Sequence, residues 1–423
     1  MEEQLLHFIW HRRLFNQGSL STTENEPIEI VHTGIPNSDQ GPDFLQARIK
    51  IGDQLWAGHV EIHIRSSAWY LHSHERDPHY NNVILHVVWK EDQPVVTANG
   101  FRIPCIELES RVDKTLLDRY HHLMNNQEWI PCASSLAQVS EVVRNSWLDR
   151  MMAERLETKT AYIQQILDRC GQHWEQAFFV AMARQLGAPA NSDAMEELCI
   201  KIPWSIIRKH GDRIDQIESI LFGCAGMLEK EMHDPYVSRL KHEFEFLKKK
   251  YQLPVMPGLH WKFMRMRPVH FPTIRIAQLA MIIKSVSHFV TLLEEKESAD
   301  PWIKRFMVRP HDSFWDTHYH FTSQSPKAIK QIGRNTAAVL VINVVAPVMF
   351  LYGKLQGKPT MKDHAIDLLQ QLPAEENGII TQWRKCGWKI EDAGQTQGLL
   401  HLKKTYCEQR RCMHCAIGLQ VLH

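Results

Sequence analysis

The chain has 423 residues, more than one ordinary hydrophobic core accommodates, so its length predicts two or three domains. Apolar residues make up 44% of the sequence, which excludes a largely disordered chain. The 49 basic and 48 acidic side chains leave a net charge of +1, so any nucleic-acid-binding surface has to be local.

The sequence shows no sign of secretion or of membrane insertion. The opening segment, MEEQLLHFIWHRRLFNQ, lacks the basic start and the cleavage site of a signal peptide. The longest apolar run, residues 337–352, is interrupted by Asn343 and Pro347 and predicts a buried helix. Nine cysteines, scattered until the C-terminus, are not a secreted disulfide framework. We therefore expect a cytoplasmic protein with no membrane partner.

The first third of the chain alternates in the manner of a mixed α/β sheet. Its expected elements are an amphipathic helix at 2–16 and strands at 27–34, 44–51, 55–64 and 81–89. Gly52-Asp53 predicts a tight hairpin turn, and a second hairpin is expected around Asn99-Gly100. A helix, a strand hairpin, a crossover and a further strand indicate a mixed sheet.

Asp43, Glu61 and His63 form the first candidate site. Asp43 opens one predicted strand, and Glu61 and His63 share one face of the next. Carboxylates on adjacent strands could hold Mg²⁺ or Mn²⁺, with His63 activating or orienting a water. An aspartate followed by E-x-K resembles the PD-(D/E)XK nucleases, with His63 in place of the lysine. The alternative is that Asp43 caps a turn and Glu61 pairs with a histidine.

A second group of titratable residues follows in the polar segment HSHERDPH and the strand after it. Its spacing is one residue away from the H-x-H-x-D-H pattern of metallo-β-lactamase-type hydrolases. We expect one or two of its members to support the ligands of the first site, and the alternative is a set of surface or hydrogen-bonded side chains. The group comprises His72, His74, Asp77, His79 and His86.

From about residue 113 the apolar spacing becomes helical and predicts a large helical region. Within it, basic and aromatic side chains interleave around Arg267-Pro268. Such a loop could grip phosphates and stack bases, although arginine and tryptophan also pack at domain junctions. The candidate nucleic-acid-binding residues are Lys262, Arg265, Arg267 and Arg275.

The C-terminal cysteines suggest a second metal site. Cys386, Cys407, Cys412 and Cys415 have the spacing C-x(20)-C-x(4)-C-x(2)-C. Four thiolates could close a structural zinc site or hold an iron–sulfur cluster, as in some nucleases of the PD-(D/E)XK type. Zinc is the first choice because a small tail without a hydrophobic core needs a bound metal to stabilise its fold. The alternative is buried or redox-active thiols.

The whole chain resembles the uncharacterised bacterial family DUF2851. The resemblance rests on FIWHRRLF, EPIEI, GPDF, WAGHVEIHIRSS, WYLHSH, VILHVV, RPVHFPTIRIAQLA, INVVAPVMFLYG and YCEQRRCMHCAIG. It implies no established activity. Ala68 stands where the family has an acidic residue, which argues against a catalytic part for position 68.

The predicted fold class is therefore α+β: a nuclease-like α/β domain at 1–112, a helical domain at 113–375 and a cysteine-bearing module at 376–423. The hypothesis is a Mg- or Mn-dependent nuclease acting on nucleic acid. The rival hypothesis is a non-catalytic factor that binds nucleic acid or protein on a degenerate nuclease-like fold, since the usual lysine is missing.

Overall fold

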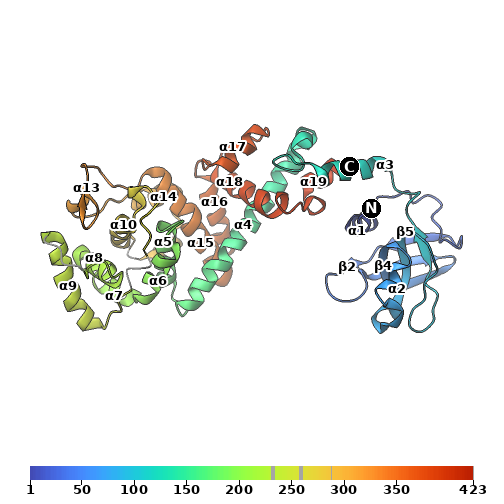
Figure 1. The fold of residues 1–423 in the computed structure, drawn as a ribbon, viewed down its shortest axis with the longest axis horizontal. Coiled ribbons are helices and arrows are strands. Elements are labelled where there is room, and N and C mark those ends of the chain that lie inside the picture. The colour runs from blue at the N-terminus through green and yellow to red at the C-terminus, as the bar shows by residue number, and fades with distance from the viewer. Residues whose placement is uncertain (230–233, 257–260, 287, 423) are drawn as a thin grey trace. The chain divides into compact units, whose positions relative to one another are not determined.

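The computed structural model describes residues 1–229, 234–256, 261–286 and 288–422, and the chain forms two compact units (Figure 1). Unit 1 comprises Met1–Ser140 with Tyr406–His423, and unit 2 comprises Glu141–Thr405. The fold is mixed α+β, as predicted, with the main sheet in unit 1 and a largely helical unit 2. The domain limits at residues 112 and 375 stay predictions, because contact-defined units and folding domains need not share their ends.

Unit 1 is built on a mixed sheet with the strand order β1-β3-β4-β5-β6, and β2 also pairs with β3. The pairs among β1, β2, β3 and β4 are antiparallel, whereas β5 runs parallel to both β4 and β6. The strands are β1 (Ile28–His32), β2 (Ile35–Pro36), β3 (Phe44–Ile51), β4 (Gln54–Arg65), β5 (Val83–Lys90) and β6 (Cys105–Glu107).

Alternation along β4 decides what each face of the sheet carries. Val60 and Ile62 enter the main core of unit 1, where helix α1 (Glu3–Arg12) packs against β4 and β5. The predicted hairpin turn is confirmed, because Ile51 pairs with Gln54 and Gly52 has a φ of 58°, which glycine adopts without strain. Glu61 and His63 therefore lie on the face opposite to the main core.

The crossover from β4 to β5 covers that opposite face. It consists of α2 (Ala68–Leu71) and the 3₁₀ turns η1 (His74–Arg76) and η2 (Pro78–Asn82). A small second core fixes the crossover on the sheet and comprises Trp69, Tyr80, Val83, Val95 and Ile103. This burial, about 25 cal/mol per Å² of apolar surface, holds the His72–His74 segment over β4.

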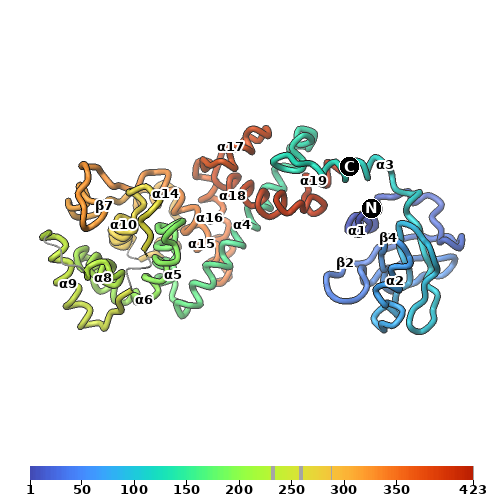
Figure 2. The backbone as a smooth tube through the Cα atoms, viewed as in Figure 1, coloured from blue at the N-terminus to red at the C-terminus, as the bar shows by residue number. Residues whose placement is uncertain are grey.

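The C-terminal residues complete unit 1. Helix α19 (Ala416–Leu422) contacts α3 (Lys114–Asn125) and η3 (Ala133–Gln138). Figure 2 shows α19 near α3. Cys412, in the turn η8 (Cys412–His414), belongs to the main core of unit 1. The π-helix η7 (Leu402–Cys407) spans the division between the units.

Unit 2 packs its helices around one extended apolar core. In chain order they are α4 (Glu141–Arg169), α5 (Trp174–Leu186), α6 (Ser192–Lys201), α7 (Trp204–Lys209), α8 (Ile214–Cys224), α9 (Pro235–Tyr251), η5 (Pro268–His270), α10 (Pro272–Ser285), α11 (Phe289–Glu294), α12 (Ala299–Phe306), α13 (Phe314–Thr317), α14 (Arg334–Leu340), η6 (Val341–Val345), α15 (Ala346–Leu355), α16 (Pro359–Gln370), α17 (Gly378–Lys385) and α18 (Ala393–His401). The short strands β7 (His318–His320) and β8 (Ser323–Gln324) form a small hairpin.

One helical stretch, Arg334–Leu355, is long and apolar enough to cross a membrane. Its apolar window is 83% buried inside the protein, which is the behaviour of a core helix in a soluble protein. Among the described residues no other helix meets the same length and hydropathy criteria. The prediction of a buried helix at residues 337–352 is confirmed.

Candidate metal centre

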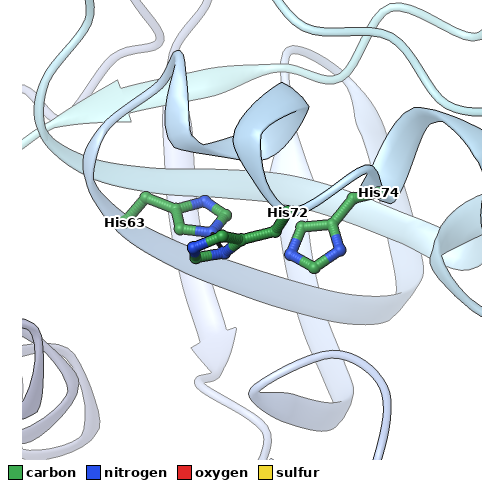
Figure 3. Close-up of side chains that lie close together, drawn as sticks. All are labelled: His63, His72 and His74. Carbon is green, nitrogen blue, oxygen red and sulfur yellow. Dashed lines mark hydrogen bonds between the residues drawn. The ribbon is translucent and has the colours of Figure 1, made fainter.

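Three histidines converge on the crossover side of the unit 1 sheet (Figure 3). His63 comes from β4, and His72 and His74 come from the segment that follows α2. Each offers one ring nitrogen, and these three nitrogens lie within 4.8 Å of one another. In the described part of the chain this is the one group of three His, Cys, Asp or Glu side chains that gathers so closely.

The carboxylate of Glu61 adds a fourth donor atom. Its Oε1 lies 3.2 Å from His74 Nε2 and 3.7 Å from His63 Nε2, and His63 Nε2 lies 3.2 Å from His72 Nδ1. Two ligands of one tetrahedral zinc ion, each bound at about 2.0–2.1 Å, are about 3.3 Å apart. The two separations of 3.2 Å are close to such an edge, and the 3.7 Å separation is longer.

Burial sets the protonation of this cluster. It lowers the pKa of His63 to about 2, with a further contribution from His86, His74 and His72, and it also lowers the pKa of His74. Burial, together with the charge of Asp43, raises the pKa of Glu61 to about 9. His63 and His74 are therefore neutral near pH 7, which is the form of imidazole that binds metals.

His86 contacts Nδ1, the second ring nitrogen of His63. His63 Nδ1 lies 2.9 Å from the Nε2 of His86, a fully buried side chain on β5. A proton on His63 Nδ1 leaves Nε2 with its lone pair directed at Glu61 and His72, which is the usual arrangement of a histidine ligand. Among the described residues, His86 Nδ1 and His74 Nε2 have no hydrogen-bond partner although both are buried. His74 Nε2 is near Glu61 but not in hydrogen-bond alignment.

Hydrogen bonds between backbone N–H groups and carboxylates connect Asp43 to the Glu61 segment. The Asp43 N–H donates to Glu61 Oε2 at 3.1 Å, and Asp43 Oδ2 accepts the Ile62 N–H at 2.9 Å. The same Oδ2 lies 3.3 Å from His7 Nε2. Burial opposes charge on His7, but the hydrogen bond and the charge of Asp43 outweigh it and raise the His7 pKa. The structure thus brings Asp43, Glu61 and His63 together, with Asp43 reaching the cluster through Glu61.

The predicted supporting group divides in two. His72 and His74 contribute nitrogens to the cluster and His86 contacts His63, whereas Asp77 and His79 pair with each other at 2.8 Å on the surface. The H-x-H spacing of His72 and His74 was the signal in the sequence. Because the spacing to Asp77 differs by one residue from the H-x-H-x-D-H pattern, the sequence predicts only a supporting role for these two histidines.

The predicted nucleic-acid-binding residues all lie in unit 2. Lys262, Arg265 and Arg267 are exposed. Arg275 is buried within α10, where its guanidinium donates to Gln278 at 2.8 Å and lies 2.6 Å from His270 Nδ1. Its contacts are therefore internal to unit 2, and the binding surface itself stays a prediction.

The four cysteines are divided between the units. Cys386 lies in unit 2, whereas Cys407, Cys412 and Cys415 lie in unit 1. The last three do not bring their sulfurs within 4.8 Å of one another, a distance that only the histidine group meets among the described residues. Burial and the nearby Cys415 raise the pKa of Cys412 to about 11, so its thiol is protonated at neutral pH. Zinc or iron–sulfur ligation by these cysteines stays a prediction.

Comparison with known families matches residues 3–378 to the family described as protein of unknown function, DUF2851. The chain belongs to the DUF2851 family. Comparisons of this DUF2851 protein with curated proteins and with solved structures find no match. The function of the histidine cluster therefore has to be argued from its own geometry.

Proposed function

We propose that unit 1 of this DUF2851 protein is a metal-dependent phosphodiester hydrolase of the nuclease type. The observation that carries the proposal is the convergence of His63, His72 and His74, whose ring nitrogens lie within 4.8 Å of one another, with Glu61 Oε1 close to two of them. The order of residues supports it, since Asp43 precedes β3 and Glu61 and His63 lie in β4, as in the PD-(D/E)XK pattern.

The types of ligand atom at the site determine which metal ion it prefers. Imidazole nitrogens suit zinc and other late transition metals, whereas Mg²⁺ prefers an all-oxygen shell. Three histidines and one carboxylate therefore favour Zn²⁺, with Mn²⁺ as the second choice and Mg²⁺ as the third. Asp43 has a positioning part, because its Oδ2 is already occupied by the Ile62 N–H and His7.

A bound ion of this kind polarises a phosphoryl oxygen and lowers the pKa of a water molecule. His72 is exposed while His63 and His74 are buried, so the cluster opens to solvent beside His72. Glu61 keeps one oxygen on the Asp43 N–H and directs the other at the histidine nitrogens. That second oxygen either completes the ligand shell or accepts a proton from the water.

Unit 1 also has a cavity of about 680 Å³ next to β4. It is lined in part by Ala57 and His59, and His59 is two residues, or about 7 Å, along β4 from Glu61. Among the residues that the structure describes, no Asp or Glu side chain lines it. Arg48 supplies a cation, and Gln46 and Asn82 supply amides.

The cavity lining also contains two histidine rings, His32 and His59, that can donate hydrogen bonds. His32 Nδ1 accepts the Gly34 N–H at 3.1 Å, and His59 Nδ1 accepts the Gln46 N–H at 3.4 Å. Since Nδ1 is the acceptor in both rings, Nε2 is the ring position left to donate. A lining of donors without carboxylates suits an anionic chain such as a phosphodiester backbone.

The test combines metal analysis with hydrolysis, on wild type, His74→Ala and the matched control His79→Ala. His79 lies in the same segment but pairs with Asp77 on the surface. We expect about one zinc per chain in wild type and in His79→Ala, and hydrolysis of bis(p-nitrophenyl) phosphate and of single-stranded DNA or RNA. His74→Ala should lose both. Metal without hydrolysis would favour the non-catalytic binding factor, and no metal in the wild type would refute the centre.

A further inference from the structure

Unit 2 contains a second polar site, independent of the histidine cluster. Lys159 on α4 lies where α4 meets the π-helix η6 and helix α18. Its Nζ donates to Asn343 Oδ1 and to Gln397 Oε1, each at 2.6 Å. Among the described residues Lys159 forms no ion pair with a carboxylate.

Lys159 borders a cavity. Lys159 and Asn343 both line a cavity of about 240 Å³, together with Tyr162 and Arg184 and the apolar side chains Ile163, Ile166 and Ala181. Asn343 is in the middle of η6, a single π-turn inside the long core helix, and such turns are frequent at functional sites. The cavity is somewhat smaller than the pockets that hold drug-sized ligands, so it suits a ligand of only a few heavy atoms.

The two hydrogen bonds of Lys159 Nζ satisfy both donors of a neutral amine. A neutral –NH₂ group has two N–H donors and one lone pair, and the two amide oxygens accept both donors. Burial and the charge of Arg155 lower the pKa of Lys159 to about 7, with Glu375 opposing them. At neutral pH a large share of the Lys159 amine therefore keeps its lone pair.

We infer that Lys159 is a nucleophilic amine whose cavity takes a small aldehyde or ketone and binds it reversibly as an imine. The Nζ lone pair attacks the carbonyl carbon and forms a C–N bond, while the oxygen takes up the amine proton. Loss of water then breaks the C–O bond and leaves the C=N bond, and hydrolysis reverses both steps. Asn343 and Gln397 hold the amine as its acceptors in the free state.

The experiment traps the imine in the full-length protein. Glycolaldehyde and sodium cyanoborohydride are added at pH 7, and peptide mapping measures the rate of mass addition at each lysine. Exposed Lys249, near the end of α9, is the internal reference. At pH 7 a lysine of pKa near 7 has roughly 10³ times the neutral fraction of an ordinary lysine, so we expect Lys159 to react at least about 10-fold faster than Lys249.

Asn343→Asp is the decisive variant, because it keeps Lys159 and nearly the same shape while placing a carboxylate against the amine. A carboxylate at that distance favours the charged form, so labelling of Lys159 at pH 7 should fall to the Lys249 level and return at about pH 9–10. The inference is wrong if Lys159 in the wild type reacts no faster than Lys249. It is also wrong if Asn343→Asp leaves the rate at pH 7 unchanged.

Discussion

Each unit buries a polar cluster, but the two clusters differ in how their hydrogen bonds are satisfied. In unit 2, Gln176 donates to the carbonyls of Cys199 at 2.7 Å and Ile202 at 3.1 Å, and accepts the Trp204 N–H. In unit 1, His74 Nε2 and His86 Nδ1 are buried without a hydrogen-bond partner among the described residues. A buried polar atom left unpaired costs about 1–3 kcal/mol. The Gln176 cluster of unit 2 thus stabilises the fold, whereas the histidine cluster of unit 1 has the features of a binding site.

The largest effect expected from this contrast is on metal affinity. In His74→Leu the apolar side chain keeps the packing against Tyr80, whose ring stacks on His74 at 3.8 Å. We expect metal affinity to fall at least about 1,000-fold, beyond the 10–100-fold typical of residues behind the ligands. The free energy of unfolding of the metal-free protein should stay the same or rise, since an unpaired nitrogen is removed.

Competition with a chromogenic zinc chelator measures the affinity, and urea unfolding in the presence of a chelator measures the stability. If the metal-free variant unfolds several kcal/mol more easily than wild type while zinc binding is retained, His74 is a structural residue and the contrast with Gln176 disappears.

Glu218 is a buried carboxyl group in unit 2, and the effect of pH on stability tests how it contributes to the fold. Burial raises the pKa of Glu218 to about 8, above its ordinary value of 4.5. Between these two values the unfolded chain ionises Glu218 while the folded chain keeps it protonated, so stability falls as pH rises. We expect a loss on the order of 3 kcal/mol between pH 5 and pH 7.5 from this group alone.

Glu218→Gln should remove this pH dependence, because an amide does not ionise. The amide oxygen can still accept the Tyr236 O–H, which now lies 3.0 Å from Glu218 Oε2, so the buried site keeps its hydrogen bond. Urea unfolding curves at pH 5, 6, 7 and 7.5, followed by circular dichroism, give the comparison. Parallel pH profiles for variant and wild type would show that Glu218 ionises normally in the folded protein.

Gln176→Ala tests the satisfied cluster directly. It leaves two carbonyls and one N–H in a buried site without their partner, so we expect a loss of about 2 kcal/mol in the free energy of unfolding and no change in zinc affinity. Gln164→Ala is the control, because Gln164 is half-buried and its side chain donates to Asp168 of the same helix, with no hydrogen bond to a buried backbone group among the described residues. Equal stability of the two variants would contradict a structural role for Gln176.

The sequence predicted much of the unit 1 sheet because strand signals are local. The alternation in residues 55–64 placed Glu61 and His63 opposite the core, and Gly52 marked the hairpin. Helical spacing likewise predicted α1 and the core helix at residues 337–352. These features depend on neighbours within a few residues, so one sequence is sufficient to identify them.

The composition of the histidine cluster was harder to predict, because it depends on how an irregular segment crosses the sheet. His72 and His74 reach His63 only because Trp69 and Tyr80 anchor the crossover in a small core of its own. Similarly, the separate C-terminal module at 376–423 stays a prediction, and the packing of Cys412 in the main core of unit 1 is not indicated by the sequence. Contacts over such sequence separations leave no periodic signal.

The smallest expected effect concerns His86, which contacts His63 from the neighbouring strand β5. In His86→Leu, His63 Nδ1 loses the group that lies 2.9 Å from it, so the proton is free to move to Nε2 and compete with the metal. We expect zinc affinity to fall about 10–100-fold. His86→Gln supplies a side-chain oxygen that can accept the His63 Nδ1 proton, so it should recover part of the loss. If the leucine and glutamine variants bind zinc equally well, His86 acts by packing alone, and the tautomer of His63 is set by some other contact.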